Sequence, residues 1–275
     1  MLKKFFIFIF VIAGVALLSY PWFSNWYASR GHQEVINQYQ EQAKARDAER
    51  ISEEIRLAEA YNSSLSGDAV TDPFVLGSGT AVPGGYESIL DPDGTGVMAV
   101  LMIPKINLKL PVYHGVSESV LERGIGHMMT TAFPVGGPGT HCVVAGHRGL
   151  PSQELFTRLD VLDIGDEFFF DVMGQMRAYR VDDISVVLPD QTDSLKPVPG
   201  EDYVTLTTCT PLGVNSHRLL IRGARIPYVE GLEQQIPLGA PLSKSEIQLI
   251  IGATIAAITM GIAIIFAAKR RKKSQ

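Results

Sequence analysis

The sequence is poor in cysteine, in charge and, at its two ends, in acidic residues. Two cysteines among 275 residues exclude a disulfide-rich scaffold. Only 19% of the residues are charged and 46% are hydrophobic, which excludes a chain that is disordered throughout. Residues 1–23 and 247–275 contain no Asp or Glu, although they hold seven of the 24 Lys and Arg. Residues 24–246 therefore combine 29 acids with 17 bases, and this negative charge argues against a nucleic-acid partner.

A nearly continuous apolar run covers residues 5–23 and follows two lysines. Nineteen helical residues span about 28 Å, close to the thickness of the hydrocarbon core of a bilayer. The alternative is a cleaved signal peptide, which also begins with basic residues. No Ala-x-Ala cleavage site follows the run, however, and Trp22, Trp26 and Tyr27 lie where an interfacial aromatic belt is expected. We therefore predict a retained transmembrane helix.

A second apolar run covers residues 247–268, without a charge, and five basic residues follow it directly. This pattern predicts a second transmembrane helix with a stop-transfer cluster. Because basic flanks stay inside, both termini are expected in the cytoplasm and the acidic middle outside the cell membrane. The predicted organisation is a cytoplasmic N-terminus (1–4), a transmembrane helix (5–23), a helical segment (24–65), a loop (66–95), a β domain (96–228), a linker (229–246), a transmembrane helix (247–268) and a basic cytoplasmic tail (269–275).

The β domain is predicted from short segments rich in β-branched and aromatic residues and bounded by Gly, Pro or Asp. Only residues 154–159 between them suggest a helix. Seven or eight short strands with so little helix indicate a closed barrel or a sandwich. The loop before this domain is rich in Gly, Pro, Ser, Thr and Asp, and loops of that length are usually functional or disordered. The expected strands are Val97–Ile103, Leu108–Tyr113, His141–Ala145, Glu167–Val172, Met176–Val187, Tyr203–Thr208 and Arg218–Ile226.

Three residues at strand ends can support nucleophilic chemistry. Cys209 ends one strand, His147 follows another, and Arg218 begins the strand after Cys209. If they converge, the thiol can attack a carbonyl, the imidazole can move protons, and the guanidinium can stabilise the oxyanion. Spacing alone also allows a structural, non-catalytic interpretation. In it, the cysteine is a small core residue, the arginine forms a surface ion pair and the histidine is a turn residue.

The motifs around these residues resemble those of the sortase family. Residues 205–209 (TLTTC) look like its TLxTC signature, residues 145–149 (AGHRG) match the motif of its catalytic histidine, and residues 215–220 (NSHRLL) match that of its catalytic arginine. The likeness extends over about residues 96–227. It implies an eight-stranded β-barrel whose Cys209, His147 and Arg218 cleave a Leu-Pro-x-Thr-Gly-like signal after Thr. The acyl group is then held as a thioester until an amine takes it.

Further features resemble class C sortases, which assemble pili. Asp72-Pro73-Phe74 matches their lid motif, the second predicted span is common among them, and residues 209–218 resemble one of their sequences, with Leu212 where an aromatic residue is commoner. The resemblance implies that Phe74 covers the Cys209 thiol and that Asp72 pairs with an arginine. That arginine is Arg218 or Arg148. A second Asp-Pro pair at 91–92 is expected to be an ordinary turn.

Other reactive residues are expected to be structural. Cys142 lies in mid-strand, about 16 Å along the strand from His147, which is too far for a disulfide with a cysteine beside that histidine. Arg222 shares the strand parity of Arg218 and is a rival oxyanion donor, but it lies about 13 Å further from the turn, which favours Arg218. Neither a cofactor nor a metal site is expected, because no histidines have the spacing of metal ligands. The histidines considered are His32, His114, His127, His141 and His217.

The sequence thus predicts a membrane-anchored cysteine transpeptidase that joins pilin subunits through lysine isopeptide bonds. Its expected partners are proteins with a Leu-Pro-x-Thr-Gly-like sorting signal, an acceptor lysine amine and the lipid membrane. One alternative is a sortase that attaches surface proteins to a cell-wall precursor. A more distant one is a non-catalytic, membrane-tethered binding module, which the intact Cys209, His147 and Arg218 argue against.

Overall fold

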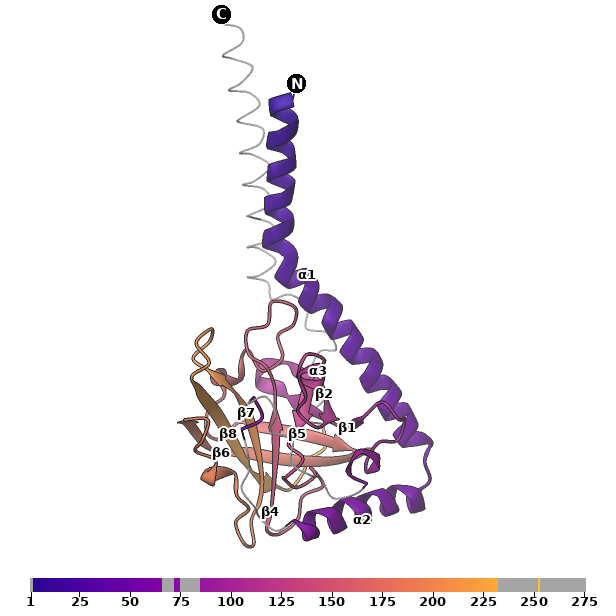
Figure 1. Cartoon of the computed structure of the whole chain (residues 1–275). Coiled ribbons are helices and arrows are strands. Elements are labelled where there is room, and N and C mark those ends of the chain that lie inside the picture. Colours follow the sequence, from indigo (N-terminus) through magenta and orange to yellow (C-terminus); the bar gives the residue numbers. More distant parts are fainter. Residues whose placement is uncertain (1, 66–71, 75–84, 232–251, 253–275) are drawn as a thin grey trace, which may run out of the picture.

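The computed structural model describes residues 2–65, 72–74, 85–231 and 252. Its first element is a long helix, α1 (Leu2–Ala45), which contains Pro21. The predicted span 5–23 and the first part of the predicted helical segment are therefore one continuous helix. Figure 1 shows α1 leaving the globular part and changing direction part-way, as expected where a proline removes a helical hydrogen bond.

One helix among the described residues is long and apolar enough to cross a membrane, with its candidate range at Ile9–Ala45 near the N-terminus. None of its apolar window is buried against the rest of the protein. The second predicted span, 247–268, lies outside the described residues except for Gly252. Of the two predicted spans, the described residues therefore bear on the first.

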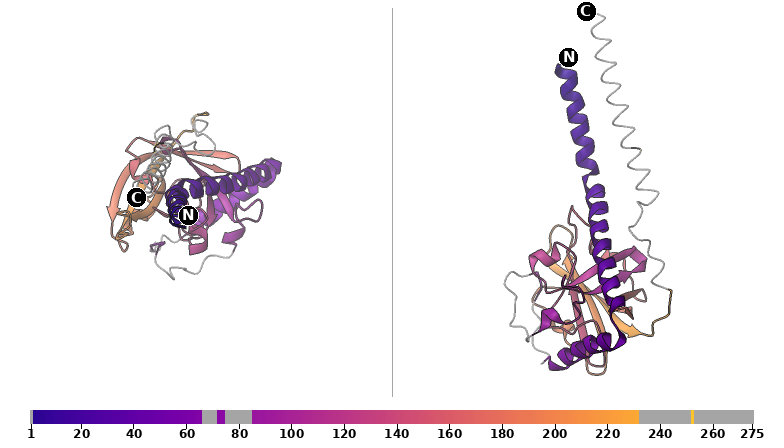
Figure 2. Two further views of the ribbon diagram at one scale, coloured as in Figure 1. Left: turned by 90° about the horizontal axis from the view of Figure 1, so that it is seen from above. Right: turned by 90° about the vertical axis from the view of Figure 1, so that its right-hand side faces the viewer.

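The second helix, α2 (Ala48–Ser64), begins where Asp47 Oδ1 accepts a hydrogen bond from Arg50 N at 2.8 Å, as an N-cap does. Its buried face carries Ala58 and Tyr61 into the barrel core. Figure 2 shows α1 running down the side of the barrel and α2 lying across the end that faces away from the N-terminus. The second half of α1 and the whole of α2 therefore pack on the barrel, whereas the first half of α1 projects away from it.

The strands form a closed barrel in the order β1-β2-β3-β4-β7-β8-β6-β5, which confirms the predicted eight-stranded architecture. The strand missing from the sequence prediction, β3, has only three residues, too few to show an alternating pattern. The strands are β1 (Val97–Ile103), β2 (Leu108–His114), β3 (Ile125–His127), β4 (Thr140–Ala145), β5 (Glu167–Val172), β6 (Gln175–Val187), β7 (Asp202–Thr210) and β8 (His217–Ile226).

The helix predicted at residues 154–159 was wrong. These residues form turns that end in a 3₁₀ turn at Leu159–Val161. Leu155 has a positive φ of 35°, and Phe156 N donates to the carbonyl oxygen of His147 at 3.0 Å, so tertiary bonding replaces the helical pattern. A short helix that the sequence did not suggest, α3 (Glu118–Leu121), lies between β2 and β3.

The barrel interior is a single apolar core. Large side chains from several strands are almost fully buried in it, which fixes the register of each strand because a slip by one residue would turn these side chains outward. The core thereby determines which side chains of each strand point inward. Its members include Leu101, Phe168, Phe170, Leu206 and Ile221.

Candidate active site

The parallel pairing of β4 with β7 places His147 beside Cys209. Ala145 is the register partner of Thr207, and Gly146 N still donates to Thr207 O at 3.1 Å. Two residues after Ala145 the first segment reaches His147, and two residues after Thr207 strand β7 reaches Cys209. The Thr208 hydroxyl donates to Gly146 O at 2.7 Å and holds the two segments together at this level.

The antiparallel pairing of β7 with β8 places Arg218 directly opposite Cys209. Direct partners in such a pair project from the same face, with Cβ atoms about 4.5–5.5 Å apart. Arg222, the rival arginine, is instead the register partner of Thr205, and its guanidinium binds Asp182 at 3.0 and 2.9 Å. The structure thus brings together the three residues that the sequence singled out and keeps Arg222 away from them.

Asp72 binds the guanidinium of Arg218 at this site. Its carboxylate accepts two hydrogen bonds from Arg218, Nε to Oδ1 at 2.8 Å and Nη2 to Oδ2 at 2.6 Å, and both side chains are almost fully buried. Pro73 is buried as well. The half-buried ring of Phe74 lies 5.9 Å from the His147 ring, centroid to centroid, and Arg218 Cζ lies 5.0 Å from its centroid. Of the two arginines open to Asp72, it therefore pairs with Arg218.

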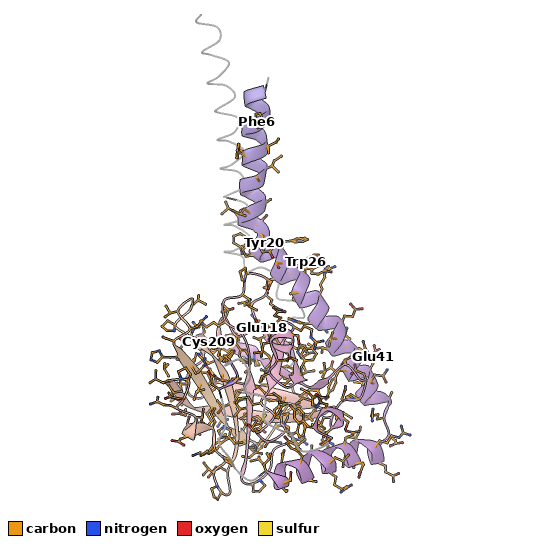
Figure 3. The ribbon with its side chains drawn as sticks, viewed as in Figure 1. Phe6, Tyr20, Trp26, Glu41, Glu118 and Cys209 are labelled. Atoms are coloured by element: carbon orange, nitrogen blue, oxygen red, sulfur yellow. The ribbon has the colours of Figure 1, made fainter. Side chains whose placement is uncertain are left out.

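Four of the five N–H donors of Arg218 are used in this arrangement. Its Nη1 donates to the carbonyl oxygens of Asn215 and His217, both at 3.1 Å, while its other nitrogens bind Asp72. Asp72 therefore occupies the Nε–Nη2 edge of this guanidinium. Figure 3 places Cys209 at the end of the barrel from which the N-terminal helix departs.

Comparison with known proteins assigns the chain to a protein family. The model of the sortase domain matches residues 101–226. The structure of sortase C-1 from Actinomyces oris is 46% identical in sequence, with a TM-score of 0.61, and the match covers 65% of this chain and 99% of that one. The chain belongs to the sortase family. Sortases are cysteine transpeptidases, so membership confirms the enzyme class expected from the motifs.

Other relatives support the same assignment. The structure of Streptococcus pneumoniae sortase C is 42% identical, with a TM-score of 0.65, and the match covers 71% of this chain and 97% of that one. The resemblance to class C sortases is confirmed by these structures. Sortase SrtE1 from Streptomyces coelicolor is 31% identical over 163 residues, which are 54% of this chain and 44% of that protein. The matched region thus spans less than half the length of that relative.

The thiol of this sortase is shielded from solvent. Cys209 is 8% exposed and unpaired, and burial raises its pKa; Arg218 opposes the shift and Asp72 adds to it. Burial also lowers the pKa of His147, against a smaller opposite effect of Glu118 and Glu122. Both shifts disfavour the charged forms. The closed site therefore favours a neutral thiol beside a neutral imidazole.

Arg148 fixes the segment that follows His147, a role that the sequence did not reveal. Its Nη1 donates to Thr210 Oγ1 at 3.2 Å, and its Nη2 pairs with Asp160. Arg148 and Thr210 are the residues immediately after His147 and Cys209. Together with the Thr208 bond to Gly146, this contact brackets the two reactive residues on both sides. Such long-range partners have no signature in the local sequence.

Cys142 is buried and unpaired in the core, opposite Val204, as expected for a structural cysteine. Its burial raises the pKa of its thiol well above the ordinary value. Within the part of the chain that the structure describes, no three His, Cys, Asp or Glu side chains are grouped so as to hold a metal ion.

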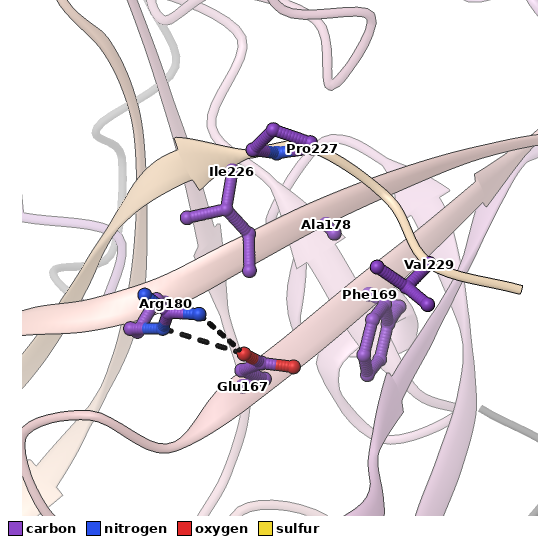
Figure 4. A pocket seen from close by; sticks show the side chains of 7 residues that line it. All are labelled: Glu167, Phe169, Ala178, Arg180, Ile226, Pro227 and Val229. Atoms are coloured by element: carbon purple, nitrogen blue, oxygen red, sulfur yellow. Dashed lines mark hydrogen bonds and ion pairs between the residues drawn. The ribbon is translucent and has the colours of Figure 1, made fainter. Parts of the chain in front are cut away.

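A hollow of about 270 Å³ lies far from the site, at the other end of β8. Figure 4 shows it between β5, β6 and the segment after β8, with Arg180 and Glu167 paired at 2.9 Å on one side. Ile226 in its wall is eight residues from Arg218, about 26 Å along the strand. This hollow is therefore separate from the cysteine site.

Proposed function

We propose that this protein is a membrane-anchored class C sortase that joins pilin subunits. It cleaves a Leu-Pro-x-Thr-Gly-like signal between Thr and Gly and transfers the acyl group to a pilin lysine. The observation that carries the proposal is the pairing of Cys209 with Arg218 across β7 and β8, with His147 at the same level and Asp72 on the guanidinium. The apolar helix α1 supports the membrane anchor.

In the acylation step, Cys209 Sγ gives its proton to His147 and attacks the carbonyl carbon of the threonine. Arg218 donates to the oxygen that becomes negatively charged, which stabilises the tetrahedral intermediate. The C–N bond to glycine then breaks, and the imidazolium returns the proton to the leaving amine. The product is a thioester on Cys209.

In the second step, the neutral lysine amine attacks the thioester carbonyl, and His147 takes a proton from the attacking nitrogen. The C–S bond breaks as an isopeptide bond forms, and the His147 imidazolium gives its proton to the leaving sulfur, so that Cys209 becomes a thiol again. Arg218 again faces the oxyanion. The groups return to the neutral thiol and imidazole that burial favours.

Asp72, Pro73 and Phe74 serve as a lid that holds the resting enzyme closed. Asp72 occupies the guanidinium that the oxyanion needs, and Phe74 contacts His147. Pro73 stiffens the link between these two anchors. A sorting signal or a partner protein must displace the lid before Cys209 can react.

Pilin is favoured over a cell-wall precursor as acceptor because the matched structures are sortase C enzymes, and that of Streptococcus pneumoniae sortase C is described in terms of pilin substrate specificity. The cell-wall alternative shares the acylation step and differs only in the amine. The proposed location is the cell membrane, with both termini in the cytoplasm and the barrel outside.

The test uses the full chain in membranes with purified pilins that carry a sorting signal. The expected result is a covalent ladder of pilins, absent for Cys209→Ala and close to wild type for Cys142→Ala. Products that form only with a cell-wall peptide amine would favour the alternative acceptor. A ladder formed by Cys209→Ala would refute the assigned nucleophile.

A further inference from the structure

The N-terminal helix contacts the barrel as soon as it leaves the predicted span 5–23. Ser24 Oγ donates to Ser152 O at 2.9 Å, and Asn25 Oδ1 accepts from Glu154 N at 2.9 Å. Ser152 and Glu154 belong to the loop that follows His147. The first residues outside the predicted bilayer are therefore already bonded to the active-site end of the barrel.

The helix stays docked along the next turns. His32 Nε2 contacts Arg123 O at 2.9 Å, and Ile36 and Tyr39 are fully buried. The Tyr39 hydroxyl donates to Met98 O at 2.9 Å, which ties the helix to the first barrel strand. Apolar packing and hydrogen bonds thus fix the part of α1 after Pro21 against the barrel, and the continuous helix joins this part to the predicted span.

Two aromatic residues mark the height of the membrane surface on this helix. Trp26 and Tyr27 are 48% and 71% exposed, as expected for side chains that face lipid headgroups. They lie one to three residues after Ser24 and Asn25, within about 5 Å along the helix axis. The loop bonded to those two residues therefore lies at headgroup height. In Figure 3, Cys209 and Glu118 lie at the barrel end that is nearest Trp26.

Apolar side chains are exposed at the same end. Leu212 is 54% exposed and Val214 69% exposed in the turn between β7 and β8, the strands whose adjoining ends carry Cys209 and Arg218. A side chain added at Gly149, two residues after His147, would collide with Leu212, so this turn packs against the histidine loop. Apolar and polar side chains together at this height suit the interface of a bilayer.

We propose that the catalytic end of the barrel lies against the outer surface of the membrane, with residues 149–154 and 211–216 among the lipid headgroups. The partner is the lipid surface itself. The consequence is that substrates approach Cys209 along the bilayer plane, which suits chains that are themselves membrane-anchored. This inference rests on the membrane anchor of the proposed function, and it needs no assumption about the acceptor amine.

The test measures depth by fluorescence. The full chain with Cys209→Ala is placed in phosphatidylcholine nanodiscs, and Ser152→Cys, Leu212→Cys or Ser52→Cys is labelled with bimane. Ser52, exposed on α2 at the far end of the barrel, is the matched control. Buried Cys142 is expected to resist labelling. Headgroup-attached nitroxide lipids should quench labels at Ser152 and Leu212 several-fold more than the label at Ser52.

Equal quenching at all three positions would overturn the proposal, because it would mean that the barrel tumbles freely or stands away from the membrane. Stronger quenching at Ser52 would mean the opposite orientation, which also contradicts it. Co-elution of each variant with the nanodisc is measured separately. Loss of co-elution would refute the membrane anchor in the proposed function, whereas co-elution with equal quenching refutes only the orientation.

Discussion

Opening of the lid by substitution of Asp72 and Phe74 should expose Cys209 to reagents. Removing one partner of a buried, hydrogen-bonded ion pair costs about 3–5 kcal/mol, and the pair of Asp72 with Arg218 is of this kind. Half-burial of Phe74 adds about 1 kcal/mol, and its contact with the guanidinium adds about 0.5–2 kcal/mol. Ordering the three lid residues opposes closure by about 3–6 kcal/mol. The midpoints of these ranges leave a net closed preference of about 2 kcal/mol, and we take about 1–3 kcal/mol as the expected range.

The double variant Asp72→Asn/Phe74→Ala should therefore increase the rate of Cys209 modification by about 5- to 150-fold, since about 1.4 kcal/mol corresponds to a factor of ten. The assay is the second-order rate of modification by a neutral thiol reagent. Because Asp72 contributes to the raised pKa of Cys209, the rate is measured across pH to separate the thiolate fraction from access.

The matched control is Asp182→Asn, which weakens the bidentate pair with Arg222 outside the site. It should leave the modification rate unchanged. A rate that does not rise in the double variant, with the same thermal unfolding midpoint as wild type, would refute the lid. An equal rise in Asp182→Asn would show that the effect is not specific to Asp72.

Three further predictions concern the oxyanion, the buried histidines and the loop after His147. Arg218→Ala should lower kcat/KM about 10²- to 10³-fold and Arg218→Lys should recover little, whereas loss of activity only in Arg222→Ala would show the wrong arginine was chosen. Burial lowers the pKa of His127 to about 3 and of His141 to about 4, so the unfolded chain binds more protons than the folded chain below pH 6.5. The free energy of unfolding, measured with urea, should therefore decrease as the pH is lowered from about 6.5 to 4. A flat profile over this range would contradict the prediction. Arg148→Ala should lower kcat while pilin binding persists, and unchanged kcat would remove its positioning role.

The barrel could be predicted because seven strands are long enough to show a run of β-branched and aromatic residues between turn residues. The eighth, β3, is too short for any pattern. The helix expected at 154–159 failed because the positive φ of Leu155 and the bond from Phe156 to His147 depend on contacts elsewhere in the fold. Continuity of α1 through Pro21 was not predicted either, because apolar and amphipathic stretches look like separate elements in a sequence.

The convergence of Cys209, His147 and Arg218 could be predicted because each lies at a strand end within a recognisable motif. The partner of Asp72 could not, since Arg218 and Arg148 are both close to the site and only the fold decides between them. The contact of Ser24 with Ser152 joins residues 128 positions apart and has no sequence signature.

The most direct test of the account is the mass of the acyl-enzyme. The full chain is incubated with a Leu-Pro-x-Thr-Gly-like peptide, quenched in acid, digested and analysed by mass spectrometry. The account predicts that the peptide up to its threonine is attached to Cys209 as a thioester, that hydroxylamine releases it, and that Cys209→Ala lacks it. An adduct on another residue, or none even in Asp72→Asn/Phe74→Ala, would contradict the account.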